Sequence, residues 1–568
     1  MNDRIEALIE VGWTRNDFAI ACCGLRDYRH PAVHVLEPAE LLRQATHGDP
    51  LLSRYSVVIL ELRRRTWQEN VLLGLLRKIR QRHRPELRVV VSTDHDAEDC
   101  LEYLTQQSSR KRRRWDTSST QQQLQKGVIL SQTEPFTVDC LYLEKATSSY
   151  VRSAMEVAAR LLAEAKPTDT ILCFLPTRSD IDAAMQLAEE TIDAKAVVFQ
   201  QIFAYTRTLA GSPPGKPRIL LATDRTPIVP NVQYVIDAGW VRLSYFDVKT
   251  GLDRSLTVPT SRQEATARAR LAPHGQCFRL YPEKLYRETL PERSTPEMLR
   301  CNLTACVLTI KALGVQNVAE FEMLDTPSSE ALQHALESLY ALDAIDDHTN
   351  LTARGLDLSS FPTEPRISRM LLESLSLGCS WDVLSVASAL QVRDIFLRKP
   401  RGAQRALDYE ASMTEVSDPS GDHVTLANVL SEFEDHGMNE SDCRERYWNY
   451  GAIRRALSIR KDLAGFLRRF GKVESYMGND RSEVIRKCVT AGFFFNVAHR
   501  SSNDGRYSTL KGKHPVAIAP SSVLHQGRPN AYVLFSESVD DSRGEVELRC
   551  VSSIEAKWLR EMAPHYWK

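Results

Sequence analysis

Hydrophobic and polar positions predict two regions of mixed strand and helix in the first half of the chain. Residues 55–62 (YSVVILEL) are an apolar run typical of a buried strand, residues 70–81 (NVLLGLLRKIRQ) have amphipathic helical spacing, and residues 87–93 (LRVVVST) form a second strand. This order predicts a parallel sheet with covered faces. The same alternation returns between residues 170 and 239, so we expect a second α/β domain spanning 136–285.

The second half of the chain changes character after TPEMLR at 295–300. Helical spacing dominates up to about residue 475, and LTARG at 351–355 is short enough for the wing of a small winged-helix domain. From about Ser482 short strands reappear between turn residues, beginning with GFFFNVAHR at 492–500 and ending with EVELRCVSSI at 545–554. Short strands at regular spacing predict a small barrel.

Composition is that of a globular protein and sets few limits on the partner. The 568 residues are 43% hydrophobic and 26% charged, with 73 basic and 73 acidic side chains, so any basic surface has to be local. No secretory signal and no apolar stretch of membrane-spanning length is visible. The 12 cysteines lack any CxxC spacing, which predicts reduced thiols and no zinc site.

A polar, low-complexity stretch at 106–127 is typical of a disordered insertion. It contains the basic run RKRRR, Arg110 to Arg114. Such a run can serve in nuclear import or nucleic-acid binding, and it can equally be a solvated loop. Both interpretations stay open.

Several segments in a fixed order resemble the DEAH-box RNA helicase family, and the tail is similar to its spliceosome-associated members. They are TPEMLRCNL at 295–303, GDHVTLAN at 421–428, AGFFFNVA at 491–498, PSSVL at 520–524 and WLREMAPHY at 558–566. The resemblance implies a multidomain fold, α/β plus α plus β. Its expected parts are a truncated and degenerate first RecA-like domain (1–135), a second RecA-like domain (136–285), a winged helix (286–356), a helical bundle (357–475) and a C-terminal OB-fold barrel (476–568).

The nucleotide motifs that the resemblance implies are eroded. Where the family has strand, Asp-Glu-Ala-His and Glu-Arg-Thr, this chain has ILELRRRT, and only Glu61 and the pair Arg65-Thr66 match. An acidic pair would hold magnesium, which the guanidinium groups of Arg63, Arg64 and Arg65 would repel. Direct clamping of ATP phosphates by these arginines is the rival hypothesis, and a solvated basic helix start is the simpler interpretation.

Other motif positions depart in the same direction. No GxxxxGK[ST] phosphate loop occurs in the sequence, and LIEVGW at 8–13 looks like the strip that follows it. Ser92-Thr93-Asp94 stands in place of Ser-Ala-Thr, and ATDRTPIVPN at 222–231 is a shortened motif with two prolines. Arg268 and Arg270 remain from the arginine motif without its glycines. A missing upstream exon would account for the phosphate loop alone. We therefore expect no catalytic residues, no metal site and no cofactor, although the family uses ATP and Mg²⁺.

Candidate RNA contacts lie in the second RecA-like domain's hairpin, 237–259, and in the barrel. Aromatic and basic residues alternate in the hairpin, and barrels of this type track phosphates with cations and stack bases on aromatics. Ordinary hairpin packing is the alternative for the first group. The candidates are Trp240, Arg242 and Lys249 in the hairpin, and Arg500, Arg506, Tyr507, Lys511, Lys513, Ser521 and Ser522 in the barrel.

Two further positions carry simpler interpretations. His423 in GDH lacks a second ligand at zinc spacing, so a helix-cap or packing role is predicted. The amphipathic helix expected at 448–472 should bury its apolar side chains and leave its arginines solvated.

Together these features predict a nuclear RNA-processing factor, in pre-mRNA splicing, that binds RNA or ribonucleoprotein without ATPase activity. The expected partners are RNA, spliceosomal or other ribonucleoprotein proteins and a G-patch protein, with no membrane. An active ATP-dependent RNA helicase with atypical motifs is the first alternative. A protein-interaction scaffold without RNA contact is the second.

Overall fold

The computed structural model describes residues 19–23, 33–62, 65–93, 97–105, 138–191, 198–202, 216–223, 231–392, 394–397, 399–400, 402–501, 505–525, 530–540, 544–564 and 566–567. The chain forms two compact units. The first unit comprises 1–129, 246–253 and 296–568, and the second comprises 130–245 and 254–295. The predicted insertion at 106–127, with its basic run, lies outside the described residues.

The first unit begins with a parallel sheet of order β2-β1-β3-β4. The strand, helix and strand predicted from the sequence are confirmed as β3, α3 and β4. Helix α3 starts where it does because the Thr66 hydroxyl accepts from the Glu69 amide while the Glu69 carboxylate accepts from the Thr66 amide. The elements are β1 Ala19–Cys23, β2 Val33–Leu36, α2 Pro38–His47, β3 Tyr55–Leu62, α3 Trp67–Arg82, β4 Arg88–Thr93 and α4 Ala97–Thr105.

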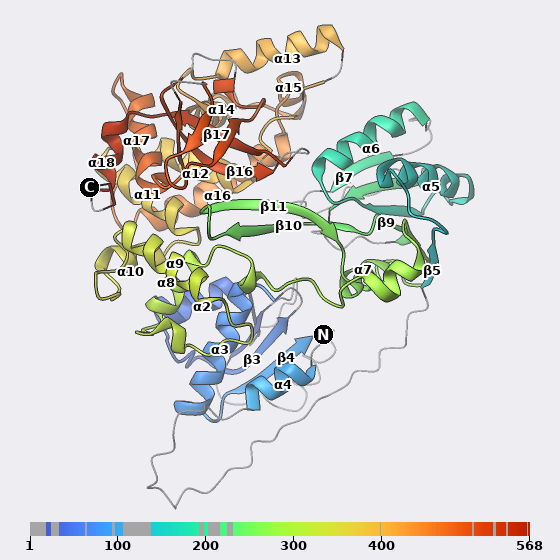
Figure 1. Ribbon diagram of the computed structural model, residues 1–568, viewed down its shortest axis with the longest axis horizontal. Coiled ribbons are helices and arrows are strands. Elements are labelled where there is room, and N and C mark those ends of the chain that lie inside the picture. The colour runs from blue at the N-terminus through green and yellow to red at the C-terminus, as the bar shows by residue number, and fades with distance from the viewer. Residues whose placement is uncertain are drawn as a thin grey trace, which may run out of the picture. The chain divides into compact units, whose positions relative to one another are not determined.

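Helices follow through most of the first unit (Figure 1). They are η2 Glu297–Leu299, α8 Thr304–Ala312, η3 Val318–Glu320, α9 Ser329–Ala341, α10 Ala353–Ser359, α11 Pro365–Ser376, α12 Ser380–Val392, α13 Ala403–Val416, α14 Asp422–Asp435, α15 Glu440–Glu445, α16 Tyr450–Leu467 and α17 Arg481–Phe493. The prediction of a wing at LTARG is wrong, because Thr352 caps the N-terminus of α10 there. A single antiparallel bridge, Ile345 to Leu351, precedes that helix.

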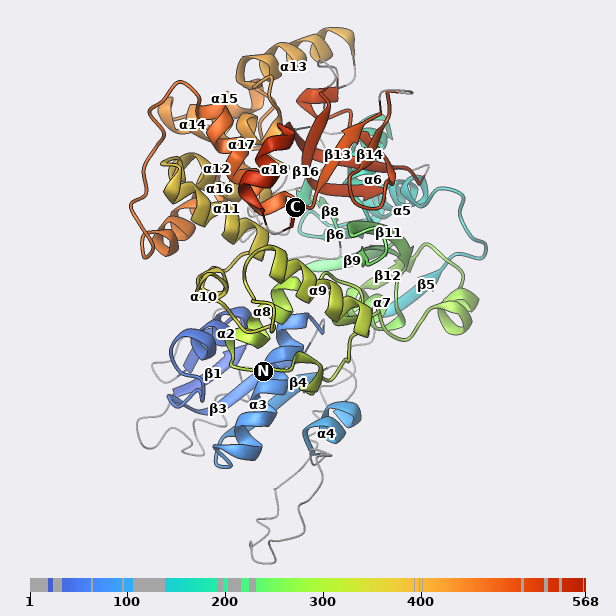
Figure 2. The same ribbon diagram turned by 60° about the vertical axis from the view of Figure 1, so that its left-hand side comes forward.

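Five strands close the predicted barrel in the order β13-β14-β15-β17-β16 (Figure 2). The strand expected at GFFFNVAHR is wrong in its first part, since Gly492 and Phe493 belong to α17 and the strand begins at Val497. A buried apolar helix end and a buried strand look alike over so short a run. The elements are β13 Val497–Arg500, β14 Tyr507–Thr509, β15 Pro515–Ile518, η4 Val523–His525, β16 Tyr532–Asp540, β17 Val546–Ser553 and α18 Ala556–Met562.

The second unit is built on a six-stranded parallel sheet of order β5-β12-β9-β6-β8-β7. Helices α5 and α6 pack on one face of this sheet and α7 on the other. Strands β10 and β11 pair separately as a hairpin. The elements are β5 Asp139–Tyr142, α5 Tyr150–Glu164, β6 Thr170–Phe174, α6 Arg178–Thr191, β7 Val198–Ile202, β8 Arg218–Ala222, β9 Val232–Asp237, β10 Trp240–Asp247, β11 Leu252–Pro259, α7 Arg262–Ala269, β12 Gln276–Arg279 and η1 Leu285–Thr289.

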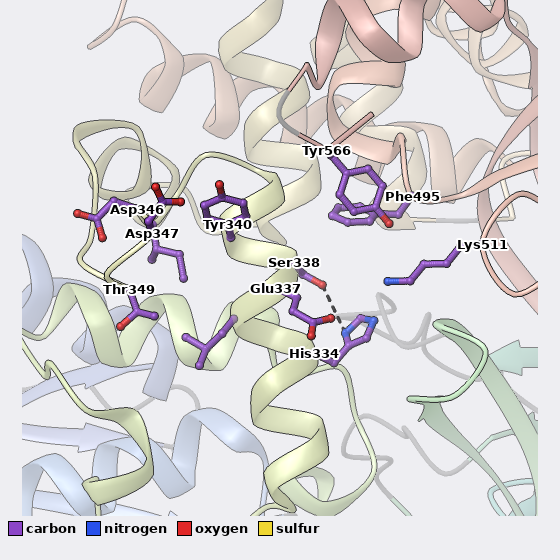
Figure 3. A pocket seen from close by; sticks show the side chains of 12 residues that line it. His334, Glu337, Ser338, Tyr340, Asp346, Asp347, Thr349, Phe495, Lys511 and Tyr566 are labelled. Atoms are coloured by element: carbon purple, nitrogen blue, oxygen red, sulfur yellow. Dashed lines mark hydrogen bonds between the residues drawn. The ribbon is translucent and has the colours of Figure 1, made fainter. Parts of the chain in front are cut away.

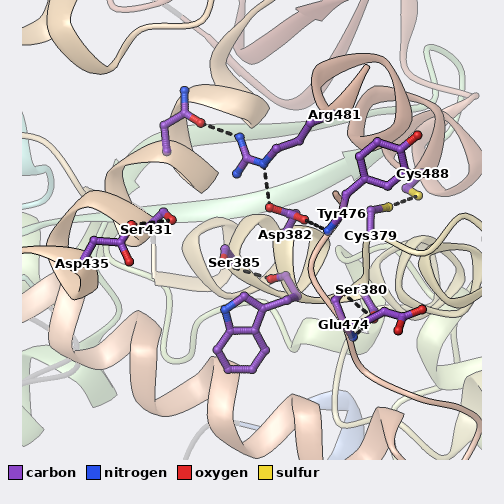
Figure 4. Close-up of polar contacts among 12 residues, drawn as sticks. Cys379, Ser380, Asp382, Ser385, Ser431, Asp435, Glu474, Tyr476, Arg481 and Cys488 are labelled. Carbon is purple, nitrogen blue, oxygen red and sulfur yellow. Dashed lines mark hydrogen bonds and ion pairs between the residues drawn. The ribbon is translucent and has the colours of Figure 1, made fainter. Parts of the chain in front are cut away.

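Buried polar groups join helix α12 to the chain that precedes and begins α17. The Arg481 guanidinium donates to Asp382 Oδ1 at 2.8 Å and to Asn428 Oδ1 at 2.8 Å (Figure 4). Arg460 on α16 is buried as well, where it donates to Ser385 Oγ and lies over the Trp381 ring. The expectation that the arginines of this helix are solvated is therefore wrong at Arg460, because its charge is paired with Glu434.

A polar junction joins the bundle to the barrel at the start of α14. The Asp422 carboxylate accepts from the amides of Val523 and Val551 at 2.8 Å and 2.7 Å. Gly421, at φ 135°, bridges to Ser552, and a Cβ there would lie 2.4 Å from the Val551 carbonyl oxygen. Only glycine fits so close an approach.

The neighbouring His423 lies fully buried in the same junction. Its Nδ1 lies 2.9 Å from Ser552 Oγ and its Nε2 lies 2.7 Å from Ser536 Oγ. The predicted packing role is confirmed. Across the described part of the chain, no group of histidine, cysteine and carboxylate side chains is placed to hold a metal. Among the same residues, no helix combines the length and the apolar character needed to cross a membrane.

Burial makes the junction sensitive to acid, because it lowers the pKa of His423 to about 3. The unfolded histidine titrates near pH 6.5. Below that pH the unfolded chain binds a proton that the folded chain does not bind. Stability is then lost as pH falls, by about 2 kcal/mol at about pH 5. We expect His423→Gln to lower the melting temperature at neutral pH and to lose less on acidification than the unchanged protein.

Thermal unfolding followed at about pH 7 and about pH 5 measures this difference. Burial raises the pKa of the adjacent Asp422, which acts in the opposite sense, so the comparison has to be between variants rather than within one protein. The exposed His348→Gln is the matched control. Equal acid losses in all three proteins would contradict the assignment.

Candidate nucleotide and RNA interfaces

The turn after strand β3 is where the sequence places the remnants of an acidic metal motif. Glu61 is buried within β3 and pairs in register with Ser92 of β4, next to Leu62 and Thr93. Arg65 follows with φ 47°, and Thr66 caps α3. Arg63 and Arg64 lie outside the described residues.

Arg65 faces a carboxylate from a distant part of the first unit. Its Nη1 lies 3.1 Å from Asp325 Oδ1, and both side chains are largely buried, with 19% and 9% of their surfaces exposed. The Asn70 amide of α3 donates to the other oxygen of Asp325 at 2.8 Å. The interpretation of a solvated basic helix start is therefore wrong at Arg65, because an ion pair between mostly buried groups holds it.

Backbone hydrogen bonds extend this contact in both directions. The Trp67 amide donates to Glu297 Oε2 at 3.1 Å, and the Glu297 amide donates to the Arg65 carbonyl at 3.3 Å. The Leu324 amide donates to Asn70 Oδ1 at 2.9 Å. We call Arg65, Trp67, Asn70, Glu297 and Asp325 the β3–α3 clamp.

Close packing further along α3 supports the clamp. A Cβ at Gly74 would lie 2.8 Å from the Glu322 carbonyl oxygen and 2.9 Å from the Phe321 ring, so glycine permits the approach. The Arg77 guanidinium pairs with Glu322 at 3.1 Å and lies over the Tyr103 ring. Helix α3 is thus held against the segment 297–325 along several turns.

The arginine-motif remnants in the second unit also have structural partners. Arg268, on α7, is 3% exposed and donates from Nη1 to Asp237 Oδ1 at 2.6 Å. The other oxygen of Asp237 accepts from the Tyr281 hydroxyl at 3.1 Å. Arg270 ends α7 with an exposed side chain. A buried carboxylate with a cation and a hydroxyl donor is a satisfied packing pair.

ATP and magnesium are the groups that the family resemblance implies, and the described remnants do not fit them. Arg65 and Arg268 are engaged by Asp325 and Asp237, and Glu61 lies buried in the sheet. Ser92 and Thr93 end β4 as half-buried strand residues. Asp94 and residues 224–230, which include both prolines of the shortened motif, lie outside the described residues. No step is assigned to either group.

The hairpin candidates differ in how free they are to meet RNA. Trp240 begins β10 with its ring partly exposed and 6.4 Å from the ring of Tyr150. Arg242 Nε donates to Ser255 Oγ at 2.9 Å across the hairpin. Lys249 lies in the turn with an exposed side chain. Lys249 belongs to the first unit and the other two residues belong to the second.

The barrel candidates fall into held and exposed groups. Arg500 Nε donates to the Gly505 carbonyl at 3.0 Å, and the Tyr507 hydroxyl donates to the Asn530 carbonyl at 2.9 Å. These two side chains therefore brace the loops around β13 and β14. Arg506, between them in sequence, has an exposed side chain.

Lys511 and Lys513 are exposed on the turn between β14 and β15. Lys513 adopts φ 51°. Ser521 is exposed, whereas Ser522 is buried, and its hydroxyl accepts from the Leu524 amide and bonds Asp422. Ser522 is thus a structural residue of the bundle–barrel junction, and its role as an RNA contact stays a prediction.

Lys511 also borders a cavity of about 510 Å³ that the sequence analysis missed. Figure 3 shows His334 and Tyr340 on α9 with Phe495, Lys511 and Tyr566 opposite them. Burial and, secondarily, the Lys511 ammonium lower the pKa of His334 to about 4. Asp346 and Asp347 line the far end. No local motif announces this cavity, because its walls are about 230 residues apart in the sequence.

Comparison with known proteins matches the domains seen in the structure. A model described as an oligonucleotide/oligosaccharide-binding (OB)-fold matches residues 485–566, and one described as a helicase associated domain (HA2), ratchet-like, matches residues 364–426. The first covers the barrel and the second the bundle helices from α11 to the start of α14.

Curated relatives cover almost the whole chain. A probable ATP-dependent RNA helicase DHX35 from Pongo abelii is 32% identical over 545 residues, 92% of this chain and 73% of that protein. The DHX35 homologue of Caenorhabditis elegans is 32% identical, covering 93% and 72%. The pre-mRNA-splicing factor ATP-dependent RNA helicase prp22 of Schizosaccharomyces pombe is 31% identical, covering 93% of this chain and 44% of that protein.

Identity at this level over this length shows the family. The chain belongs to the DEAH-box RNA helicases of the spliceosome-associated type, and its fold is multidomain, with α/β sheets, a helical HA2 region and a C-terminal OB barrel.

The clamp gives a direct test of what Arg65 does. We expect Arg65→Ala and Asp325→Ala each to lower the free energy of unfolding, with a coupling energy of about 1.5–3 kcal/mol in a double-mutant cycle, because a charged hydrogen bond between mostly buried groups is lost. Urea unfolding measures it. The exposed Arg82→Ala on the same helix is the control, and a coupling energy near zero would show that Arg65 does not depend on Asp325.

Proposed function

We propose that this chain is a DEAH-box helicase-like factor of nuclear pre-mRNA processing that binds RNA or ribonucleoprotein through its C-terminal domains and does not hydrolyse ATP. The observation that carries the proposal is that the two best-preserved arginines of its nucleotide motifs are held by carboxylates, Asp325 and Asp237. A transition-state arginine contributes roughly 10³–10⁵ in rate only when it is free to reach the phosphate.

The magnesium position supports the same proposal. Arg63 and Arg64 stand in the stretch where the family has acidic residues, while Arg65 matches the family's Glu-Arg-Thr and pairs with Asp325. A divalent cation would have to bind beside guanidinium groups, which raises its free energy in a medium of low dielectric. These changes are internal to the chain and do not depend on its ends.

RNA binding is supported by the barrel. The OB-fold match covers 485–566, and the exposed cations Arg506, Lys511 and Lys513 lie on two neighbouring turns of it. Phosphate contacts by such side chains supply sequence-independent affinity that falls with salt. Trp240, Arg242, Lys249 and Ser521 remain further proposed contacts.

The process is proposed from the relatives. One of them is named a pre-mRNA-splicing factor, and the basic run at 110–114 suits nuclear import. Spliceosomal or other ribonucleoprotein proteins and a G-patch protein are the proposed partners.

An active ATP-dependent helicase with atypical motifs is the second candidate. It is favoured by the relatives, which are named as ATP-dependent RNA helicases. It requires ATP and Mg²⁺ to bind through residues other than Arg65 and Arg268. A protein scaffold that makes no RNA contact is the remaining alternative, and the two experiments that follow separate all three.

ATP hydrolysis by the purified full-length protein, with and without saturating single-stranded RNA, tests the missing activity. We expect no turnover above the blank, because two of the three described motif arginines, Arg65 and Arg268, are held by carboxylates. Arg63→Ala is assayed beside it, and equal residual turnover in both proteins identifies a contaminant. RNA-stimulated turnover that this substitution changes would overturn the proposal in favour of the active helicase.

RNA affinity is measured for Lys511→Glu/Lys513→Glu by fluorescence anisotropy with a labelled single strand. If both lysines contact phosphates, affinity falls and the slope of log K against log salt becomes shallower by about 1.4, from about 0.7 per phosphate. Arg500 is left intact because it braces a loop. Arg454→Glu/Lys461→Glu, at two exposed positions of α16, is the charge-matched control. Unchanged affinity would favour the scaffold.

A further inference from the structure

Two cysteines face each other on neighbouring strands of the second unit. Cys140 lies on β5 and Cys277 on β12, and the two are direct register partners in a parallel pair. Strand β5 is the edge of the six-stranded sheet. Cys277 is fully buried, whereas Cys140 is only partly buried, so one thiol of the pair is accessible from solvent and the other is not.

Strand geometry brings the two sulfur atoms within bonding reach. Neighbouring strands lie about 4.7–4.9 Å apart, and the Cα atoms of disulfide-bonded cysteines are about 4.4–6.8 Å apart. Both side chains point to the face that α7 covers, since both pack in the same apolar cluster with Ala269 and Ala272. Little backbone movement is needed to join the two thiols covalently.

Neighbouring groups shift the pKa values of the two thiols in opposite directions. The pKa of Cys140 is lowered to about 6, mainly by hydrogen bonding from the Cys277 thiol and also by the Arg279 guanidinium. Burial and the carboxylates of Asp139 and Asp237 act in the opposite direction. The same hydrogen bond and burial raise the pKa of Cys277. These opposite directions make Cys140 the more acidic thiol of the pair and Cys277 the less acidic one.

We propose that Cys140 and Cys277 form an oxidation site that hydrogen peroxide converts to a disulfide and that cellular thiols reduce. The Cys140 thiolate attacks one peroxide oxygen, the O–O bond breaks, and the departing hydroxide takes up a proton to leave as water. Cys140 is then a sulfenic acid. The Cys277 sulfur attacks the Cys140 sulfur, the S–S bond forms, the S–O bond breaks, and the hydroxide leaves as water with the proton from Cys277.

The first step prepares the second. While Cys140 is a thiolate, ionising Cys277 would place two negative charges side by side, which the raised pKa of Cys277 reflects. Oxidation makes the Cys140 sulfur neutral, and this obstacle to the Cys277 thiolate disappears. Arg279, two residues along β12, stabilises whichever sulfur is charged. The disulfide would tie the edge strand β5 to the interior of its sheet.

A second pair of thiols provides an internal comparison. Cys379 and Cys488 lie in the first unit with their sulfur atoms 3.4 Å apart (Figure 4). Both are fully buried, and burial raises the pKa of Cys488 well above its usual value. Proximity is therefore present at this pair, while exposure is missing and burial disfavours the Cys488 thiolate.

The experiment treats the folded full-length protein with a molar excess of hydrogen peroxide at neutral pH, blocks remaining thiols with iodoacetamide and maps non-reduced tryptic peptides by mass spectrometry. We expect peptides 127–145 and 271–279 to become linked, and the link to disappear with dithiothreitol. Linkage of Cys379 to Cys488 should be slower by at least about tenfold, because both residues are fully buried away from the peroxide and burial raises the pKa of the Cys488 thiol.

Two substitutions separate the steps. Cys277→Ser, which keeps a hydroxyl donor beside Cys140, should stop the reaction at a Cys140 sulfenic acid that dimedone traps. Cys140→Ser should leave Cys277 available for alkylation only after unfolding in urea. Cys379→Ala is the control and should not change the first pair. Circular dichroism confirms that each variant folds. The proposal is overturned if peptides 127–145 and 271–279 stay unlinked, or if both pairs oxidise at the same rate.

Discussion

The carboxylate of Asp325 is the group on which the first unit depends. It receives the Arg65 guanidinium on one oxygen and the Asn70 amide on the other, and Asn70 in turn accepts the backbone amides of Leu324 and Asp325. All of these groups are largely shielded from water. Breaking one partner of such an arrangement leaves the others unsatisfied, at a cost of about 3–5 kcal/mol for a buried charge. Helix α3 and the segment 297–325 are therefore fixed to each other, and the apolar core of the unit runs continuously across them.

This contact gives a physical reason for what remains of the nucleotide motifs. The residues of ILELRRRT that match the family, Glu61, Arg65 and Thr66, lie in the sheet, the clamp and the cap of α3. Arg268 in the second unit likewise satisfies a buried carboxylate. Packing requires these side chains whether or not a nucleotide binds, so their presence in the sequence is weak evidence of catalysis.

The sequence predicted secondary-structure elements better than it predicted the contact partners of individual polar side chains. Apolar periodicity identified β3, α3, β4 and the strands of the barrel, because burial of one face determines where nonpolar side chains recur. It failed where a single buried polar contact decides the structure. Arg460 sits on a helix whose other arginines are solvent-facing or half-buried, and only Glu434 and Ser385, far along the chain, explain its burial. LTARG was misassigned because the side chain of Thr352 caps a helix rather than ending a strand. Likewise, no local pattern around Ser522 indicates its link to Asp422, 100 residues earlier.

The close approach of Gly421 to Ser552 bears on how this protein can be divided. The two family models end at 426 and begin at 485, as though the HA2 region and the barrel were independent modules. Yet the first turn of α14 donates a backbone hydrogen bond, from the His423 amide, to Ser552 of β17. The His423 ring nitrogens lie within hydrogen-bond distance of two barrel serines, Ser552 and Ser536. Cutting the chain between the two models would expose a desolvated carboxylate and imidazole on one piece and unpaired amides on the other. The start of α14 and the barrel share these buried polar contacts, so a fragment intended to carry the oligonucleotide-binding fold has to include α14 rather than begin at the boundary that sequence similarity suggests.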